Sequence, residues 1–414
     1  MLLAVLVLSA SAAVVALLAW AGTRSAGSLL LLFVLAIVAG LSLLLAASYE
    51  EDLTGVEEAS ADDAAAIPEA TESPAPEATA TETPEPAPPD QFTVEPATLA
   101  GAFANPTSFA IGDAGELYVG HSAGIERIED TTGDGYYDSR VHFGLEGGWV
   151  FGLVYHEGAV YAAVAGRVLR LADLDGDGTA DETRVLLEGL PYNQYGGHSN
   201  SGIAVGPDDQ LYMAIGGTSD HGPELEPYGG TILTMSLGGG EPEVYATGFR
   251  NPYDLAFCPD GRLYATDNGP DQMGDDLMTR PWDEVNLVER GGHYGYPDHF
   301  GPVSPDTGTI SPIADVAPSA GITGITCYAG GGYPEAYEGD LFVTLWGTFT
   351  YPTETGRRVM RVTLEETPDG PRGAAFEFAR DFGHPIDIVV DENGNLLVLD
   401  YERGQILRIA YPNV

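Results

Sequence analysis

One short pattern recurs six times along the chain, and it constrains the fold more than any other feature. Four copies have an apolar run, a turn that contains Asp or Asn, and a second apolar run, which is typical of a β-hairpin, and the copies from Leu153 and Ile325 are weaker versions, the latter resuming at Leu341. Successive copies begin 44 to 70 residues apart. Their first residues are Phe109, Leu153, Ile203, Leu255, Ile325 and Ile388. Tandem multi-strand repeats of about this length indicate propeller blades. The sequence therefore predicts an all-β fold, a six-bladed β-propeller over residues 96–414. An array of β-sandwiches is the alternative, and six tandem copies without linkers disfavour it.

Two apolar runs, residues 1–20 and 28–47, precede the repeats. Each is about 20 residues long, which is enough for a helix to cross a bilayer. Arg24 is the only charged side chain before Glu50, and the positive-inside rule places its loop in the cytoplasm. We predict a transmembrane helical hairpin over residues 1–48, with the propeller on the extracytoplasmic side of the cell membrane. A cleaved signal peptide is the alternative for the first run.

An acidic segment rich in Ala, Pro and Thr, residues 49–95, joins the apolar runs to the repeats. It has almost no large apolar residue, so it cannot bury a core, and we predict an extended, disordered linker. The chain has a formal net charge of -45 and no lysine. Without residues 1–90, 49 acids and 16 arginines remain. Such a surface argues against nucleic acid and against an anionic substrate, because phosphate would be repelled.

The two cysteines, Cys258 and Cys327, lie in separate strand-like runs. No CxxCH haem motif is present. On this placement we predict two buried free thiols in preference to a disulfide.

Polar residues stand just before the third and fourth copies, where a propeller carries its ligand-binding loops. His198 precedes the third copy, and a loop histidine that enters an inner strand can act as a general base near neutral pH. Arg250 and Asn251 precede the fourth copy, and an arginine there suits an anionic cofactor or a developing oxyanion. The alternatives are a structural histidine and an arginine paired with an acid.

Hard oxygen donors follow in Asn268-Gly-Pro270 and in the Asp283-Glu284 pair. The backbone carbonyls of Gly269 and Pro270, with the two carboxylates, suit calcium. The glycine permits a close approach of the backbone.

The order of these motifs resembles the glucose/sorbosone dehydrogenase family over roughly residues 97–412. The matching motifs are His198 eight residues before Gly206-Pro-Asp, then Gly248-x-Arg-Asn-Pro, Asp267-Asn-Gly-Pro, Asp283-Glu-x-Asn-Leu and Gly291-Gly-x-Tyr-Gly-x-Pro. Ala317-Pro-Ser and Gly383-His-Pro, before the last two copies, resemble later motifs of that family.

The resemblance implies a PQQ- and calcium-dependent enzyme that oxidises a sugar or polyol hydroxyl by hydride transfer to the quinone. His198 would match the base that takes the hydroxyl proton, with Arg250 as a second catalytic residue. The cofactor contacts would be Arg250, Asn251 and Asn268. The carbonyls of Gly269 and Pro270 would bind the calcium that polarises the quinone, and Asp283 and Glu284 would match further calcium ligands of some members. A respiratory electron acceptor in the membrane would suit the predicted anchor.

The sequence departs from the family pattern at several positions. Some members place a lysine on the quinone, and this chain has none. Ser201 and Gly202 stand where many members have an arginine, and Gly217 stands where an aspartate supports the histidine in glucose-oxidising members. Asp220 or His221 could substitute for that aspartate. The alternative function is therefore a non-catalytic propeller that has lost the quinone and binds carbohydrate or protein.

A second calcium candidate does not depend on the resemblance. Asp173, Asp175, Asp177 and Asp181 occupy positions 1, 3, 5 and 9 of a calcium-loop pattern with Gly178 at position 6. Position 12 holds Arg184 instead of the usual glutamate. We predict calcium binding here, with an ordinary acidic turn as the alternative. Residues 130–138 carry a weaker version of the same pattern.

Overall fold

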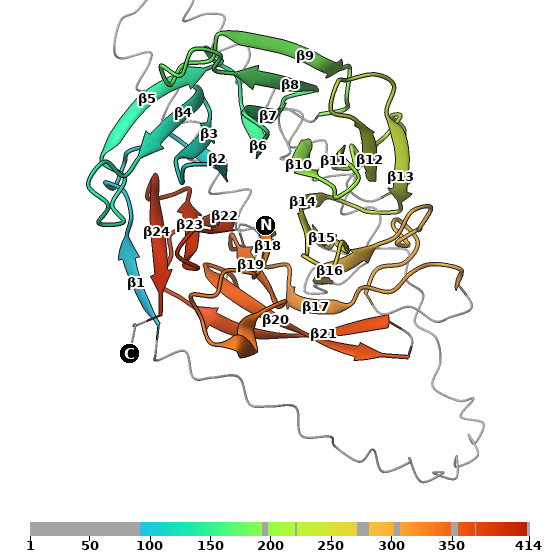
Figure 1. Cartoon of the computed structure of the whole chain (residues 1–414). Coiled ribbons are helices and arrows are strands. Elements are labelled where there is room, and N and C mark those ends of the chain that lie inside the picture. Colours follow the sequence, from blue (N-terminus) through green and yellow to red (C-terminus); the bar gives the residue numbers. More distant parts are fainter. Residues whose placement is uncertain are drawn as a thin grey trace, which may run out of the picture. The chain divides into compact units, whose positions relative to one another are not determined.

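The paired apolar runs of the six repeats form the inner strands of six four-stranded sheets, which surround one axis (Figure 1). The computed structural model describes residues 92–192, 198–219, 222–270, 281–301, 307–348, 355–368 and 370–411. Neighbouring strands within each sheet are antiparallel. The predicted six-bladed β-propeller is therefore confirmed.

Blades 1 to 3 each use four consecutive strands. Blade 1 consists of β2 (Pro106–Ile111), β3 (Leu117–His121), β4 (Gly124–Glu129) and β5 (Ser139–Gly144). Blade 2 consists of β6 (Val150–His156), β7 (Ala159–Val164), β8 (Arg167–Ala172) and β9 (Glu182–Glu188). Blade 3 consists of β10 (Asn200–Val205), β11 (Gln210–Ile215), β12 (Thr231–Ser236) and β13 (Glu243–Thr247).

Blades 4 and 5 follow the same order, and a 3-10 turn (Glu335–Tyr337) interrupts blade 5. Blade 4 consists of β14 (Pro252–Phe257), β15 (Leu263–Asp267), β16 (Trp282–Val288) and β17 (Ala314–Pro318). Blade 5 consists of β18 (Ile322–Cys327), β19 (Leu341–Leu345), β20 (Arg358–Thr367) and β21 (Gly370–Ala379).

Blade 6 joins the two ends of the propeller. Its strands are β22 (Pro385–Val390), β23 (Leu396–Asp400), β24 (Gln405–Ala410) and, at the outer edge, β1 (Thr93–Pro96). Thr93 pairs with Ala410, so the start of the propeller closes the ring. The propeller thus begins before the predicted boundary at residue 96. Phe92, which precedes β1, also belongs to the propeller, because its ring packs against Tyr333 and Phe378 in a cluster of aromatic side chains.

The core lies between the blades. Inner strands such as β3, β7 and β19 are buried along their whole length, which is why they appear in the sequence as nearly continuous apolar runs. Outer strands differ, and the first four residues of β9 are exposed. The described residues form six apolar clusters, one at each interface between neighbouring blades. Burial of apolar surface between the sheets therefore stabilises the ring.

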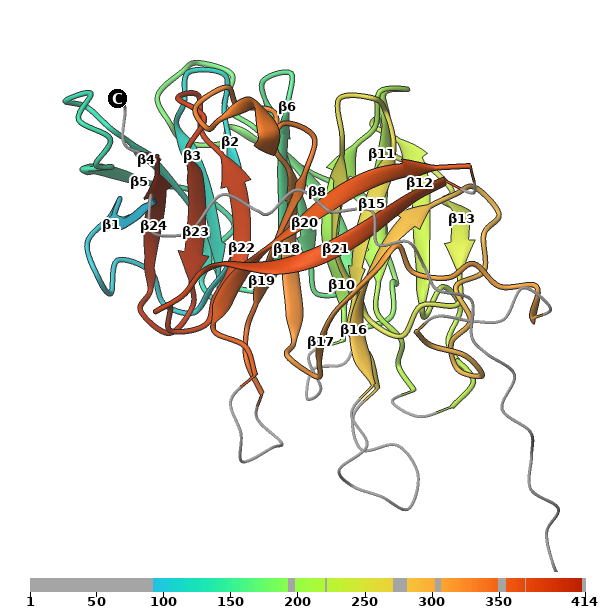
Figure 2. The ribbon, with the colours of Figure 1, turned by 90° about the horizontal axis from the view of Figure 1, so that it is seen from below.

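The strand order fixes where the loops lie. Each blade repeats the same antiparallel order around the axis, so the residues before every innermost strand lie at one end of the channel. The turns that follow these strands lie at the other end (Figure 2). We call these ends the site mouth and the turn end. His198, Arg250 and Asn251 precede β10 and β14 and so belong to the site mouth, whereas the loop from Asp173 follows β8 and belongs to the turn end.

The prediction of two free thiols is wrong. Cys258 and Cys327 form a disulfide, with their Cα atoms 5.2 Å apart. Both cysteines lie at the turn end of innermost strands, Cys258 after β14 and Cys327 at the end of β18. Because blades 4 and 5 are neighbours, runs that are 69 residues apart in sequence meet there, and the bond links the two blades.

The predicted transmembrane hairpin and most of the predicted linker lie outside the described residues. Within the stretches that the structure describes, no helix is long and apolar enough to cross a membrane.

Candidate functional site

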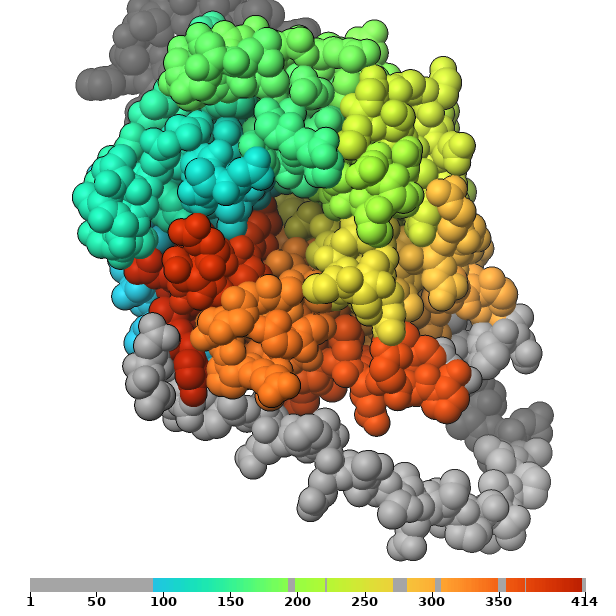
Figure 3. Space-filling view, in the orientation of Figure 1, coloured from blue at the N-terminus to red at the C-terminus, as the bar shows by residue number. Residues whose placement is uncertain are grey.

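The candidate site lies at the site mouth, where loops from blades 3 and 4 meet the channel. Figure 3 looks along the propeller axis onto the opposite end, the turn end, where the surface is hollowed at the axis and segments of several blades border this hollow. Gly217, two residues after β11, donates its N–H to the carbonyl of Arg250, so the loops of the two blades are joined by a hydrogen bond of 2.7 Å. The residues singled out in blades 3 and 4 are thus brought together.

The ring of His198 is held by the backbone. Its Nδ1 lies 2.8 Å from the carbonyl oxygen of Gly217, and because a carbonyl only accepts, Nδ1 carries the proton. The neutral ring therefore has its lone pair on Nε2, which is the arrangement that a general base needs. The Gly217 carbonyl thus supports the ring at the position where the sequence comparison expects an aspartate in glucose-oxidising members of the resembled family. Asp220 and His221, the predicted substitutes, lie outside the described residues.

Asp267 organises the neighbouring loop in blade 4. Its carboxylate accepts the backbone N–H groups of Arg250 (3.1 Å) and Asn251 (2.7 Å). Asp267 ends β15 directly opposite Pro252, so it receives the amides of the loop that enters the innermost strand. Burial raises the pKa of Asp267 to about 7, although these two amides and the Arg250 guanidinium act in the opposite direction.

The polar side chains at this loop form a network with one unsatisfied acceptor. Asn251 Nδ2 donates to Asn268 Oδ1 (2.7 Å), and Arg250 Nη1 donates to the Asn268 carbonyl (3.4 Å). Arg250 and Asn251 are buried, yet Asn251 Oδ1 has no hydrogen-bond partner among the described residues. Buried polar atoms are rarely left unpaired, so this position suits a ligand that donates a hydrogen bond or binds through a cation. Guanidinium and amide donors beside it suit an anionic quinone.

Asp283 anchors the candidate calcium loop. One of its carboxylate oxygens accepts the N–H of Gly269 (3.1 Å), and the other accepts the N–H groups of Ala320 (2.9 Å) and Ile322 (3.1 Å). A Cβ at Gly269 would lie 2.4 Å from the Trp282 carbonyl oxygen, so the backbone there leaves no room for a side chain. Asp283 therefore anchors Gly269, the residue whose carbonyl is a predicted calcium ligand.

Glu284 points away from Asp283, because successive residues of a strand face opposite sides of the sheet. It accepts hydrogen bonds from the backbone of Gly301 and from Asn286 Nδ2, and it pairs with Asp267 across β15 and β16. Burial and the nearby Asp267 raise the pKa of Glu284 to about 8. The structure therefore does not bring the two predicted carboxylate ligands, Asp283 and Glu284, to one point.

Three further residues at the site mouth carry polar or aromatic chemistry that the sequence interpretation did not assign. His384 precedes β22, donates from Nδ1 to the Trp346 carbonyl (2.8 Å), and stacks on the Trp346 ring at 4.3 Å. Arg357 Nη2 lies 3.3 Å from His384 Nε2. The signal was present in Gly383-His-Pro, because this motif occupies the place before β22 that Gly248-Phe-Arg-Asn-Pro occupies before β14. Arg357 had no comparable motif.

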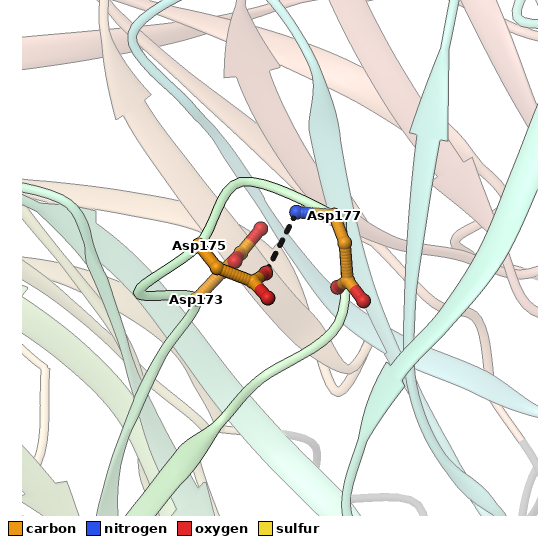
Figure 4. Close-up of side chains that lie close together, drawn as sticks. All are labelled: Asp173, Asp175 and Asp177. Atoms are coloured by element: carbon orange, nitrogen blue, oxygen red, sulfur yellow. Dashed lines mark hydrogen bonds between the residues drawn. The ribbon is translucent and has the colours of Figure 1, made fainter.

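The second calcium candidate lies at the turn end. Carboxylate oxygens of Asp173, Asp175 and Asp177 lie within 4.8 Å of one another (Figure 4). Asp173 accepts the N–H groups of Gly176 (2.7 Å) and Gly178 (2.8 Å), while Asp181 accepts that of Leu174 (2.7 Å). Three of the four predicted ligands are therefore brought together, and Asp181 closes the same loop.

The weaker copy of the pattern folds in the same way. Asp130 accepts the N–H groups of Gly133 and Gly135, and Asp138 accepts that of Thr131, at the same spacings as in the first loop. However, Thr132 stands where the stronger copy has Asp175. The backbone geometry is thus common to both loops, and the number of carboxylates distinguishes them.

Two curated proteins share part of this sequence. Quinoprotein glucose dehydrogenase B from Acinetobacter calcoaceticus is 29% identical over 148 residues, which cover 28% of this chain and 29% of that enzyme. An uncharacterized protein from Borreliella burgdorferi is 27% identical over 246 residues, which cover 54% of this chain and 64% of that protein. The chain therefore spans less than two thirds of each of these relatives.

A solved structure shares the fold. The PQQ-bound aldose sugar dehydrogenase from Streptomyces coelicolor aligns with a TM-score of 0.60 and 22% identity, covering 78% of this chain and 99% of that chain. The family model for glucose/sorbosone dehydrogenase matches residues 121–408. This range includes five of the six innermost strands and leaves out β2. This match covers more than half of the sequence and contains each site residue named above. The chain belongs to the glucose/sorbosone dehydrogenase family.

Proposed function

We propose that this protein is a PQQ- and calcium-dependent oxidoreductase that oxidises a hydroxyl group of a sugar or polyol. The observation that carries the proposal is the hydrogen bond from His198 Nδ1 to the Gly217 carbonyl, which leaves the lone pair on Nε2. Gly217, whose carbonyl accepts this hydrogen bond, also donates its N–H to the carbonyl of Arg250. The His198 ring therefore lies beside the loop of Arg250 and Asn251. Family membership supports the reaction class, because its name-giving members are sugar dehydrogenases.

One of the site residues acts as the base, and the others bind the cofactor. His198 Nε2 would take the proton of the substrate hydroxyl while the carbon that bears this hydroxyl gives up a hydride to the bound quinone. Arg250, Asn251 and Asn268 would hold the cofactor, and the carbonyls of Gly269 and Pro270 would hold calcium. PQQ, when bound, supplies the two-electron acceptor. Asp267 and Asp283 are positioning residues, because their carboxylates accept backbone N–H groups and so fix these two loops.

Arg357 could fill the place of the lysine that some family members have. It lies at the site mouth beside His384 and also approaches Glu402, with Nη1 3.3 Å from Oε2. An arginine carries a permanent positive charge and can bind a carboxylate through two N–H groups. Arg357 therefore offers a cation to an anionic cofactor from the blade 5 side of the mouth.

We further propose that the loop from Asp173 to Asp181 binds calcium. Three carboxylates in reach of one another and a glycine at position 6 support this assignment. In a calcium titration followed by thermal melting, the wild-type protein should melt at a higher temperature with calcium than with chelator. Asp175→Thr copies the residue found in the weaker loop and should reduce this gain. If calcium raised the melting temperature of this variant as much as that of the wild type, the loop would not be a calcium site.

We also propose that the propeller is exported and tethered to the cell membrane. The apolar runs before residue 48 and the Cys258–Cys327 disulfide support this location, because disulfides persist mainly outside the cytosol. Protease added to cells whose outer membrane and wall have been removed should degrade the propeller. Protection of the propeller until the cells are lysed would contradict this location.

The reaction is tested with the purified full-length protein. PQQ and calcium are added, cofactor binding is followed by calorimetry, and dye reduction is measured over a panel of aldoses and polyols. We expect PQQ binding and turnover with at least one sugar, and His198→Ala should lose turnover while PQQ stays bound. No PQQ binding would refute the proposal and favour the alternative, a non-catalytic propeller that binds carbohydrate or protein.

A further inference from the structure

Three aromatic side chains at the site mouth, Trp149, Tyr192 and Trp282, are exposed to solvent, and the first two belong to the blade 2 side. Trp149, just before β6, is 40% exposed, and Tyr192, in the segment that leads to His198, is 45% exposed. Single exposed apolar residues are common and need no explanation. Trp149 and Tyr192 differ from Val185 and Val244, which lie on the outer strands β9 and β13, because they lie in loops at the site mouth, where the proposed substrate would enter.

Both aromatic residues contact the turn between β7 and β8. The N–H of Ala165 donates to the Trp149 carbonyl (3.4 Å). A Cβ on Gly166 would lie 3.3 Å from Tyr192 Cδ1, so the tyrosine ring packs over this glycine. Trp149 and Tyr192 therefore flank the same two-residue turn.

The turn is also tied to the strand that follows His198. Asn200 accepts the N–H of Gly166 at Oδ1 (2.8 Å) and donates through Nδ2 to the carbonyls of Val164 (3.0 Å) and Arg167 (2.9 Å). Asn200 is buried and only two residues from His198. The turn that both aromatic residues contact is thus hydrogen-bonded to the strand that follows the proposed base.

Trp149 is supported on one side. Its ring lies parallel to that of Phe151, with an interplanar angle of 9° and centroids 6.3 Å apart. A ring that is packed on one side and exposed to solvent elsewhere is already oriented. A ligand that stacks on it therefore causes only a small loss of side-chain entropy on binding.

We propose that Trp149 and Tyr192 form a stacking platform for the sugar unit next to the one that is oxidised, so that the preferred substrate is a saccharide of two or more units. This inference rests on the proposed function. A pyranose ring has a flat face of C–H groups, which complements the negative face of an aromatic ring. The acidic propeller favours a neutral ligand over an anionic one, and a saccharide is neutral.

The first test measures kcat/KM of the PQQ-loaded, full-length protein for glucose, maltose and maltotriose. We expect wild type to prefer maltotriose, and Trp149→Ala should lower the ratio of maltotriose to glucose kcat/KM about tenfold, whereas Trp149→Phe should keep most of it. Val244→Ala, which removes an equally exposed side chain far from the mouth, is the matched control and should keep the wild-type ratio. An unchanged ratio in Trp149→Ala and Tyr192→Ala would overturn the proposal.

The second test does not need turnover. Maltotriose is titrated into the cofactor-free protein, and tryptophan fluorescence and calorimetry report binding. Weaker binding in both alanine variants than in wild type and Val244→Ala supports the platform even if PQQ does not bind and the proposed function fails. Equal binding in all four proteins, together with sugar turnover by the wild type, overturns the platform and leaves the proposed function standing.

Discussion

Removal of the Cys258–Cys327 disulfide should lower the stability of the propeller without changing its fold. The two cysteines are 69 residues apart in sequence, and both are buried in the cluster between blades 4 and 5. In the chain-entropy account, a bridge over a loop of this length lowers the conformational entropy of the unfolded state. This raises the free energy of the unfolded state by about 4 kcal/mol. Alanine at both positions keeps the apolar surroundings and adds no polar group.

The size of the effect on the melting temperature follows from the size of the domain. The described propeller comprises about 300 residues, and unfolding entropy near 60 °C is about 2.1 cal/mol/K per residue. A loss of about 4 kcal/mol therefore corresponds to a decrease of about 6 °C in Tm. The native contacts between blades persist, so the circular dichroism spectrum at room temperature should stay that of the wild type.

Differential scanning calorimetry of the wild type and the double variant Cys258→Ala/Cys327→Ala measures this decrease. Wild-type protein treated with a reductant should melt near the variant, and reductant should leave the variant itself unchanged, which controls for other effects of the reagent. A decrease of less than 2 °C would show that the bridge does not restrict the unfolded chain as argued.

Three further predictions concern single side chains. Gly269→Ala should weaken calcium and PQQ binding in calorimetric titrations, because its Cβ would meet the Trp282 carbonyl at 2.4 Å; wild-type affinity would contradict the close approach. Asp283→Ala should cost about 3 kcal/mol in urea unfolding, because three buried N–H groups lose a charged acceptor; a loss below 1 kcal/mol would show that water replaces it. Burial raises the pKa of Asp387, so the folded state holds its proton more tightly and stability falls as pH rises from about 4 through the folded pKa. Asp387→Asn should flatten this fall in pH-dependent melting curves, and an equally steep fall would refute the assignment.

The fold could be predicted from the sequence because the blade pattern is local. In most copies the apolar runs and the Asp- or Asn-containing turn between them specify a hairpin without reference to the rest of the chain, and repetition gives the number of blades. The contribution of residues 92–95 to blade 6 could not be predicted in this way. Thr93–Pro96 forms a strand only because β24 offers a free edge at the other end of the chain.

The site could be predicted in part. Motif order identified His198, Arg250 and Asn251, and the structure brings their loops together. The support of His198 by the Gly217 carbonyl was not predictable, because a backbone atom leaves no signal in residue type. The opposite directions of Asp283 and Glu284 follow from strand alternation, once β16 is known to include both.

Long-range contacts account for the remaining differences. Cys258 and Cys327 meet because innermost strands of neighbouring blades lie side by side, a relation that their spacing of 69 residues does not indicate. Arg357 likewise reaches His384 across the boundary between blades 5 and 6, and only the folded ring brings the two together.

The most direct test of the proposed reaction is a single-turnover experiment on the PQQ-loaded, calcium-loaded protein under anaerobic conditions. Sugar is mixed with the holoprotein, and the absorbance spectrum of the bound quinone is followed in time. We predict that sugar reduces the bound quinone in wild type, and that His198→Gln binds PQQ equally but reduces it at least about a hundredfold more slowly, as loss of a general base requires. A quinone that stays oxidised with every sugar, or a His198→Gln variant that reduces it at the wild-type rate, would contradict the account.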